Sequence, residues 1–127
     1  KPDGTKMFVS GTTGLDINEY ALSTAWDIST ATYTTVSGVL SGDTSPQDIF
    51  FKPNGLTVYV AGNTNDTVYA YALSVAWDIS TLNTTAFASK SIAAEETSIT
   101  GFWTQGRKVK ALVFRCISCG FSRTEKI

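Results

Sequence analysis

Short runs of alternating apolar and polar residues cover most of the chain. Strands are predicted at residues 5–10, 16–22, 33–39, 48–51, 56–61, 67–73 and 84–89. Residues 49–61 form a predicted hairpin, because two of these strands flank a Pro-Asn-Gly turn in which Pro presets φ and Gly accepts a positive φ. The short runs, separated by Gly, Pro, Asn and Thr, predict an all-β chain of antiparallel strands.

The strand pattern repeats at an offset of 51 residues. The segment from Tyr20 to Thr30 returns almost letter for letter between Tyr71 and Thr81. Lys1-Pro-Asp-Gly4 returns at the same offset as Lys52-Pro-Asn-Gly55. Two separate anchors that share one offset indicate an internal duplication without an insertion between them. A period of about 50 residues, rich in aromatic residues, Thr and Gly, is typical of propeller blades rather than helical solenoids.

The repeat divides the chain into residues 1–51, 52–98 and 99–127. Residues 1–51 are predicted to hold three strands of one four-stranded blade and the first strand of the next. Residues 52–98 form the second repeat. In residues 99–127 the pattern decays, since no further copy of Ala-Trp-Asp-Ile-Ser-Thr follows. The chain is thus expected to contain about two blades of a partial β-propeller, the start of a third, and a basic tail.

Two side chains of the repeated segment have predicted roles. Trp26 and Trp77 are interpreted as large buried wedges at equivalent positions between blades. Asp27 and Asp78 each precede Ile-Ser-Thr and are interpreted as side-chain caps on a tight turn.

Composition supports an ordered β protein, with 43% hydrophobic and 17% charged residues. The net charge of −1 conceals two regions of opposite sign. Residues 1–98 carry four cations against ten acids, a net of −6, whereas residues 99–127 carry six cations against one acid, a net of +5. The sequence contains no His, which removes the commonest general base and metal ligand. It also has no apolar run of transmembrane length, so no membrane partner is predicted.

The cysteines of the tail have the spacing of half a zinc knuckle. Cys116 and Cys119 provide two thiolates, but zinc takes four ligands, so a site would need a second chain or nearby carboxylates. A redox dithiol is the other reading, and it lacks a βαβ context. We expect an incidental pair and assign no metal.

Oxygen ligands gather in two predicted loops. One holds Asp66 with Asn63, Asn65 and Thr67, and the other holds Asp16 beside Gly14. Calcium takes six or more oxygens, and the spacing here matches no binding loop. Ordinary Asx turns are the favoured interpretation.

Aromatic residues are the candidates for a carbohydrate-stacking surface. They are Phe8, Tyr20, Trp26, Phe50, Phe51, Tyr59, Tyr69, Tyr71 and Trp77. Most recur at repeat-equivalent positions, which favours packing within and between blades.

A basic cluster and a carboxylate pair complete the candidates. Arg107, Lys108, Lys110 and Arg115 lie near Trp103 and Phe114, as a nucleic-acid surface would require. A solvated strand face is the favoured interpretation, so no nucleic-acid partner is predicted. Glu95 and Glu96 are adjacent carboxylates in an inter-blade loop. No nucleophile elbow is present. We therefore assign no catalytic, cofactor-binding or metal-binding residue and no cofactor.

Two motifs carry a family resemblance. Lys1-Pro-Asp-Gly-Thr-Lys6 and Leu22-Ser-Thr-Ala-Trp-Asp-Ile-Ser-Thr30, with their second copies, resemble blade repeats of bacterial and phage β-propellers of the Tyr-Val-Thr-Asn and NHL-like kind. The resemblance covers about residues 1–103. It implies a propeller scaffold, and such propellers serve mostly as binders and occasionally as enzymes.

These observations predict a non-enzymatic repeat scaffold or binding module. We expect a fragment of a larger β-propeller that presents loops for ligand or surface recognition, because a closed propeller contains four or more blades. Its expected partners are neighbouring blades or further copies of the chain, with a carbohydrate or protein as ligand. The expected location is a phage or bacterial exterior. The alternative is a fragment of a propeller lactonase or metal-dependent hydrolase with its site at the ring centre.

Overall fold

The computed structural model describes residues 1–95, 103–105 and 108–111. The strands are β1 (Lys6–Gly11), β2 (Asp16–Leu22), β3 (Ala31–Val36), β4 (Pro46–Phe51), β5 (Thr57–Gly62), β6 (Thr67–Ala72), β7 (Ala88–Ser91), β8 (Trp103–Gln105) and β9 (Lys108–Ala111). Two short 3₁₀ helices are η1 (Ile28–Thr30) and η2 (Ile79–Thr81). The all-β prediction is confirmed. Among the described residues, no helix has the length and apolarity needed to span a membrane.

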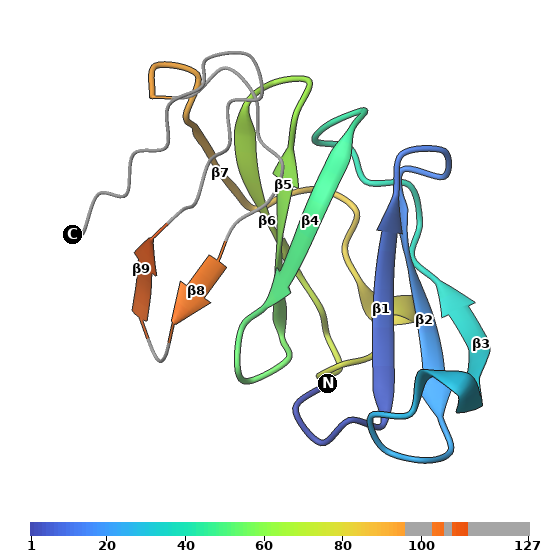
Figure 1. Ribbon diagram of the computed structural model, residues 1–127. Helices are drawn as coiled ribbons and strands as arrows, with labels where there is room; N and C mark the ends of the chain where they lie inside the picture. Colours follow the sequence, from blue (N-terminus) through green and yellow to red (C-terminus); the bar gives the residue numbers. More distant parts are fainter. Residues whose placement is uncertain (96–102, 106–107, 112–127) are drawn as a thin grey trace.

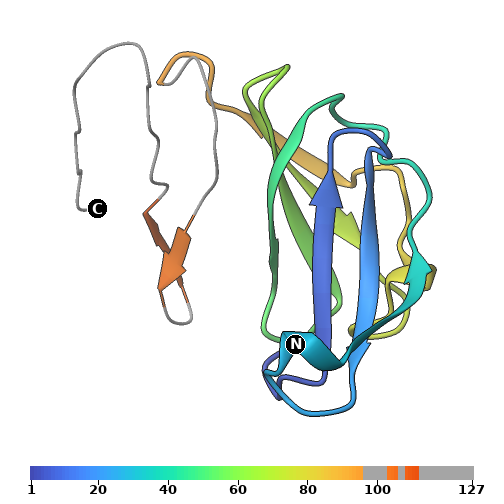
Figure 2. The same ribbon diagram turned by 45° about the vertical axis from the view of Figure 1, so that its right-hand side comes forward.

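The strands form two main antiparallel sheets. The first sheet has the order β1-β2-β3 and the second has the order β4-β5-β6-β7, while β8 and β9 form a separate hairpin. Strand order follows chain order, so each sheet is a meander. The first sheet packs beside the second, with β1 facing β4 (Figures 1 and 2). β4 lies within residues 1–51 but pairs with β5, and so belongs to the second sheet.

The predicted strands agree with the structure to about one residue except at β3, β4 and β7. β4 begins at Pro46 rather than residue 48. β3 begins at Ala31 rather than residue 33. In the second copy, the predicted strand at residues 84–89 is replaced by β7 at Ala88–Ser91. The cause is an Asx turn, in which the Asn83 side-chain oxygen accepts the Thr85 N–H at 3.0 Å and diverts the chain.

The Lys-Pro-Asp/Asn-Gly turns fold as their chemistry predicts. The Gly4 N–H donates to the Lys1 carbonyl at 2.9 Å, and the Gly55 N–H donates to the Lys52 carbonyl at 2.8 Å. Both glycines have a positive φ, +75° and +72°, which L side chains rarely adopt. The turns therefore set the register of the strands that follow them.

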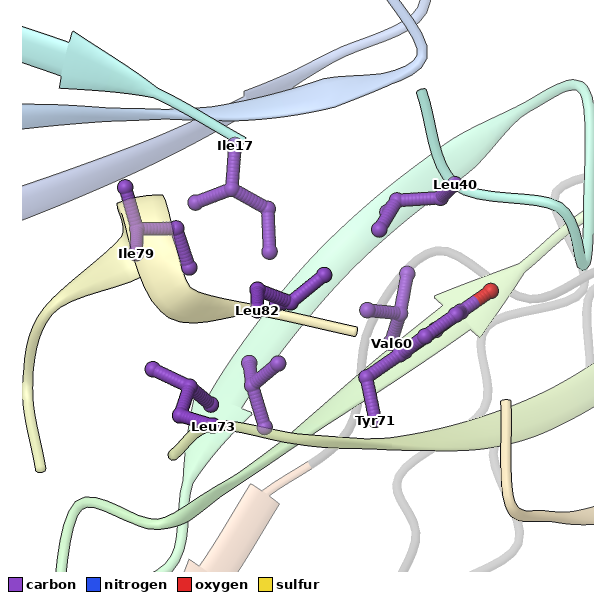
Figure 3. Packing of buried hydrophobic residues seen from close by; sticks show 8 residues of the cluster. Ile17, Leu40, Val60, Tyr71, Leu73, Ile79 and Leu82 are labelled. Carbon is purple, nitrogen blue, oxygen red and sulfur yellow. The ribbon is translucent and has the colours of Figure 1, made fainter. Parts of the chain in front are cut away.

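The hydrophobic core lies between the two sheets. Its buried members are Ile17, Leu40, Val58, Val60, Tyr71, Leu73, Ile79 and Leu82. Figure 3 shows Ile17 of the first sheet pointing toward Ile79 and Leu82 of the second repeat (residues 52–98). Tyr71 is also buried, and its hydroxyl oxygen accepts the Gly42 N–H at 3.1 Å. Burial raises the pKa of Tyr71 above its usual range.

Gly55→Ala is expected to lower the free energy of unfolding by about 2 kcal/mol. The new Cβ would stand 2.3 Å from the indole nitrogen of Trp77, on backbone that already has a positive φ. Urea unfolding followed by circular dichroism measures the change. Gly11→Ala is the matched control, because nothing lies within 4 Å of a Cβ there. Equal stability of the two variants would contradict the role of Gly55.

Candidate interaction surface

Each copy of the repeated segment folds into a turn in which a tryptophan ring packs against a glycine. Trp26 and Trp77 have positive φ angles of 66° and 62°. The backbone N–H of Trp26 donates to the Gly4 carbonyl oxygen, and that of Trp77 donates to the Gly55 carbonyl oxygen, both at 3.0 Å. A Cβ on Gly4 would lie 2.5 Å from the Trp26 ring, so only glycine fits beneath the indole. The tryptophan and the Pro-Asp/Asn-Gly turn thus act as one unit.

The predicted aspartate caps are confirmed. A carboxylate oxygen of Asp27 accepts the Ser29 N–H at 3.0 Å, and that of Asp78 accepts the Ser80 N–H at 3.1 Å. Each also accepts the serine hydroxyl at 2.6 Å. The Ser29 hydroxyl and N–H hold the pKa of Asp27 below its ordinary value. These caps fix η1 and η2 immediately after the tryptophans.

In the second unit, the first sheet covers the tryptophan. The Trp77 ring centroid lies 5.2 Å from that of Phe51 and 6.5 Å from that of Phe8. Phe8 and Phe51 stack against each other at 4.5 Å. Because Phe8 belongs to β1 and Phe51 to β4, this aromatic cluster joins the two sheets.

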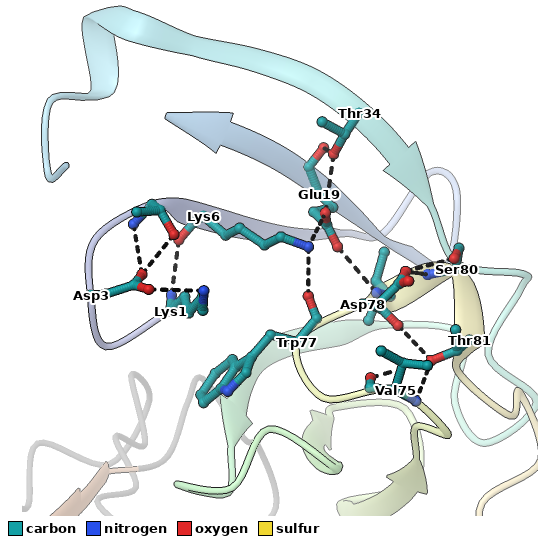
Figure 4. Close-up of polar contacts among 12 residues, drawn as sticks. Lys1, Asp3, Lys6, Glu19, Thr34, Val75, Trp77, Asp78, Ser80 and Thr81 are labelled. Carbon is teal, nitrogen blue, oxygen red and sulfur yellow. Dashed lines mark hydrogen bonds and ion pairs between the residues drawn. The ribbon is translucent and has the colours of Figure 1, made fainter. Parts of the chain in front are cut away.

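A partly buried ion pair joins the first sheet to the turn that carries Trp77. The Lys6 ammonium contacts the Glu19 carboxylate at 2.7 Å and donates to the Trp77 carbonyl at 2.8 Å. The other Glu19 oxygen accepts the Ile79 N–H at 3.1 Å. Figure 4 shows Lys6 and Glu19 reaching from the first sheet to this turn. Glu19 is 4% exposed, so these partners offset the cost of burying its carboxylate.

Cross-strand register shows which sheet faces meet. Phe8 pairs with Glu19, and Ser10 pairs with Ile17, so these side chains share one face of the first sheet. We call this the covering face, formed by Lys6, Phe8, Ser10, Ile17 and Glu19. The face that it packs against is the covered face, formed by Ile49, Phe51, Val58, Val60, Tyr69, Tyr71 and Leu73 together with Trp77 and Ile79.

The opposite face of the first sheet is the repeat equivalent of the covered face. We call it the open face, formed by Met7, Val9, Asn18, Tyr20, Leu22, Tyr33 and Val36 together with Trp26 and Ile28. Trp26 is 71% exposed and Ile28 is 74% exposed, whereas Ile79 is fully buried. Tyr33, Val9 and Val36 are also exposed. Leu22 of this face is buried, but these five apolar side chains leave much of the open face exposed.

The interpretation of both tryptophans as buried wedges is therefore wrong for Trp26. Trp77 is half-buried between the sheets, and Trp26 lies at the surface. The two turns have the same local conformation, so the difference comes from the covering face of the first sheet. That face packs on Trp77, and among the described residues no equivalent sheet packs on Trp26. Within the described part of the chain, the Trp26 carbonyl and the Ile28 N–H also have no hydrogen-bond partner.

Polar loops gather at one edge of the sheets. The buried Asp43 carboxylate accepts N–H groups of Ser45, Thr64 and Asn65 at 2.7, 3.2 and 2.9 Å. Asp43 thus ties the β3–β4 connection to the β5–β6 turn.

The two predicted oxygen-rich loops lie at this edge without forming a metal-binding cluster. Asp16 accepts the Asn18 amide at 3.1 Å, and Asp66 has a positive φ of 44°. One carboxylate oxygen of Asp66 is buried without a hydrogen-bond partner. Among the described residues, no group of three or more His, Cys, Asp or Glu side chains could hold a metal ion.

The remaining predicted aromatic residues do not form one surface. Tyr20 and Tyr33 pack edge to face at 5.7 Å on the open face. Tyr69 and Tyr71 lie 6.4 Å apart on the covered face. Phe50 and Tyr59 are half-buried and lie on the opposite side of the second sheet. Of the exposed rings, Trp26 and Tyr33 lie on the open face, whereas Phe87 lies just before β7.

Several predicted candidates lie outside the described residues. These are Cys116, Cys119, Arg107, Arg115, Phe114 and Glu96. Lys108 and Lys110 belong to β9, and Trp103 begins β8.

Sequence reasoning missed Lys6 and Glu19. One signal was available, because Glu19 alternates with Ile17 along a strand and so faces the same side as an apolar residue.

Comparison of the chain with models of protein families, with curated proteins and with solved structures finds no match.

Proposed function

We propose that the chain is a non-enzymatic repeat scaffold, part of a larger β-propeller whose units stack face to face and present loops for recognition. One observation carries this proposal. The covered face of the second sheet is packed by the first sheet, and the repeat-equivalent open face of the first sheet displays the same kinds of side chain to solvent. An exposed face with this composition is typical of a surface that packs against another sheet.

The contact between the sheets supports stacking in one direction. A covering face meets a covered face, so the two surfaces in contact differ and the interface is heterologous. Each added unit then leaves a new face of the same type available. Head-to-tail interfaces of this kind generate rings when the rotation between units closes.

The polar edge supports a recognition role. The β1–β2 turn, the β3–β4 connection and the β5–β6 turn lie together at the upper edge in Figure 1. Two of the three connections are tied by Asp43, and the Leu40 N–H donates to the Leu15 carbonyl at 2.8 Å. The loops are rich in Thr, Asn and Asp, which hydrogen-bond readily to carbohydrate hydroxyls or to peptide groups. A carbohydrate or protein ligand fits this edge best.

The solution mass of the chain tests the scaffold proposal. By light scattering, the chain is expected to associate with increasing concentration through its open face while circular dichroism shows β structure. Ile28→Lys places a charge on that face and is expected to restore the monomer. Thr12→Lys, a change in an exposed loop, is the matched control and is expected to leave association unchanged.

Two outcomes would count against the proposal. A folded, strictly monomeric chain at all concentrations would mean that the apolar side chains of the open face do not drive association between copies of the chain. Equal association of Ile28→Lys and Thr12→Lys would mean that association uses another surface. A discrete closed ring of identical copies would retain the scaffold but replace the larger protein with a homo-oligomer.

A further inference from the structure

The ion pair between the sheets satisfies two backbone groups of the turn that it covers. The Lys6 ammonium binds the Trp77 carbonyl, and the Glu19 carboxylate binds the Ile79 N–H. The equivalent groups on the open face are the Trp26 carbonyl and the Ile28 N–H. Neither has a partner among the described residues. A partner that buried these two groups without hydrogen bonds would form a less stable complex, because unpaired buried polar groups are unfavourable.

A second copy of the chain can associate with the open face through apolar side chains, but it offers no partner for these two backbone groups. Its covering face is already packed against its own second sheet. The face of the second sheet turned away from the core carries Thr57 and Ala70 at the positions equivalent to Lys6 and Glu19. Docking by that face would bring no ammonium and no carboxylate to Trp26 and Ile28. It could cover the apolar side chains only.

We propose that the open face is the docking site for a β-sheet unit that carries a lysine and a glutamate arranged as in the first unit, and that this pair selects which unit docks. The inference rests on the proposed stacking function. The partner is defined by chemistry: an antiparallel sheet with an aromatic ring that covers Trp26 and an ion pair that reaches the Trp26 carbonyl and the Ile28 N–H.

The register of the first sheet gives this partner a sequence signature. In β1, the lysine precedes the aromatic residue by two positions, as Lys6 precedes Phe8. In β2, the glutamate is paired directly with that aromatic residue, as Glu19 is with Phe8. The lysine and glutamate are then diagonal neighbours on one face, close enough to form the ion pair before docking.

The test is a longer chain in which residues 1–51 are duplicated directly before Lys1. The new junction joins Phe51 to Lys1, which reproduces the natural Phe51–Lys52 junction and its turn sequence. The added unit is expected to slow amide hydrogen exchange at the original Ile28 to the range of Ile79. It is also expected to reduce quenching of Trp26 fluorescence by acrylamide. Exchange is followed by NMR on the intact longer chain.

A second version of the longer chain isolates the ion pair. In the added unit alone, Lys6→Met and Glu19→Leu remove both charges and keep apolar side chains of similar size. This version is expected to keep Trp26 shielded but to return Ile28 to rapid exchange. The original unit retains its own pair, so Ile79 serves as an internal control.

The outcomes separate this inference from the scaffold proposal. If Ile28 stays protected without the added pair, the selection role is overturned and stacking stands. If neither longer chain shields Trp26, both proposals are overturned, and the open face is left to another occupant such as a carbohydrate or a second copy. Shielding of Trp26 in both versions with protection of Ile28 only when the pair is present supports the inference.

Discussion

Trp77→Ala is expected to lower the free energy of unfolding by about 3 kcal/mol. The substitution removes the ring that packs against Phe51, Phe8 and Gly55. Urea unfolding monitored by circular dichroism measures the loss. The side chain is half-buried, which places the expected value at the lower end for removal of a tryptophan.

The chain contains its own control for this prediction. Trp26→Ala removes the same side chain from a turn of the same local sequence and conformation, without a packed sheet above it. Its expected loss is about 1 kcal/mol, because this ring is largely exposed and rests on Gly4. The difference between the two variants measures the contact between the sheets. Equal losses would show that this contact adds no stability.

Glu19→Ala is expected to lower the free energy of unfolding by about 3 kcal/mol. It leaves the Lys6 ammonium and the buried Ile79 N–H without their carboxylate partner. The combined change Lys6→Met and Glu19→Leu is expected to recover much of that loss, because no unpaired charge remains. Urea unfolding of the single and combined variants gives the coupling between the two residues.

Glu95→Ala is the control for removal of an acid. Glu95 is exposed, so its loss is expected to change stability by less than about 0.5 kcal/mol. If Glu19→Ala were as mild as Glu95→Ala, the ion pair would be a surface contact rather than part of the interface.

The strands and turns were predictable because their signals are local. Alternation of side chains located β2 at its observed bounds, and the Pro-Asn-Gly turn located the hairpin of β4 and β5. The start of β7 was not predictable from alternation. It depends on the side chain of Asn83 capturing a backbone N–H, an interaction that competes with strand pairing.

The candidate surface could be predicted only in part, because identical local sequence occupies two environments. Ala-Trp-Asp-Ile-Ser-Thr occurs in both units, yet Ile28 is 74% exposed and Ile79 is fully buried. No local pattern separates them. The difference comes from Phe8, Lys6 and Glu19, which reach Trp77 and Ile79 from a distant part of the chain. The repeat predicted that the two segments are structurally equivalent. Contact with a distant part of the chain determined which of the two is buried.

The most direct measurement is amide hydrogen exchange at Ile28 and Ile79 in the 127-residue chain. Both amides follow Ala-Trp-Asp, so their intrinsic exchange rates are closely matched. We expect Ile79, bound to buried Glu19, to exchange more slowly than Ile28 by on the order of a hundredfold. Equal rates at the two amides would contradict the claim that one face is covered by a neighbouring sheet and its equivalent is open.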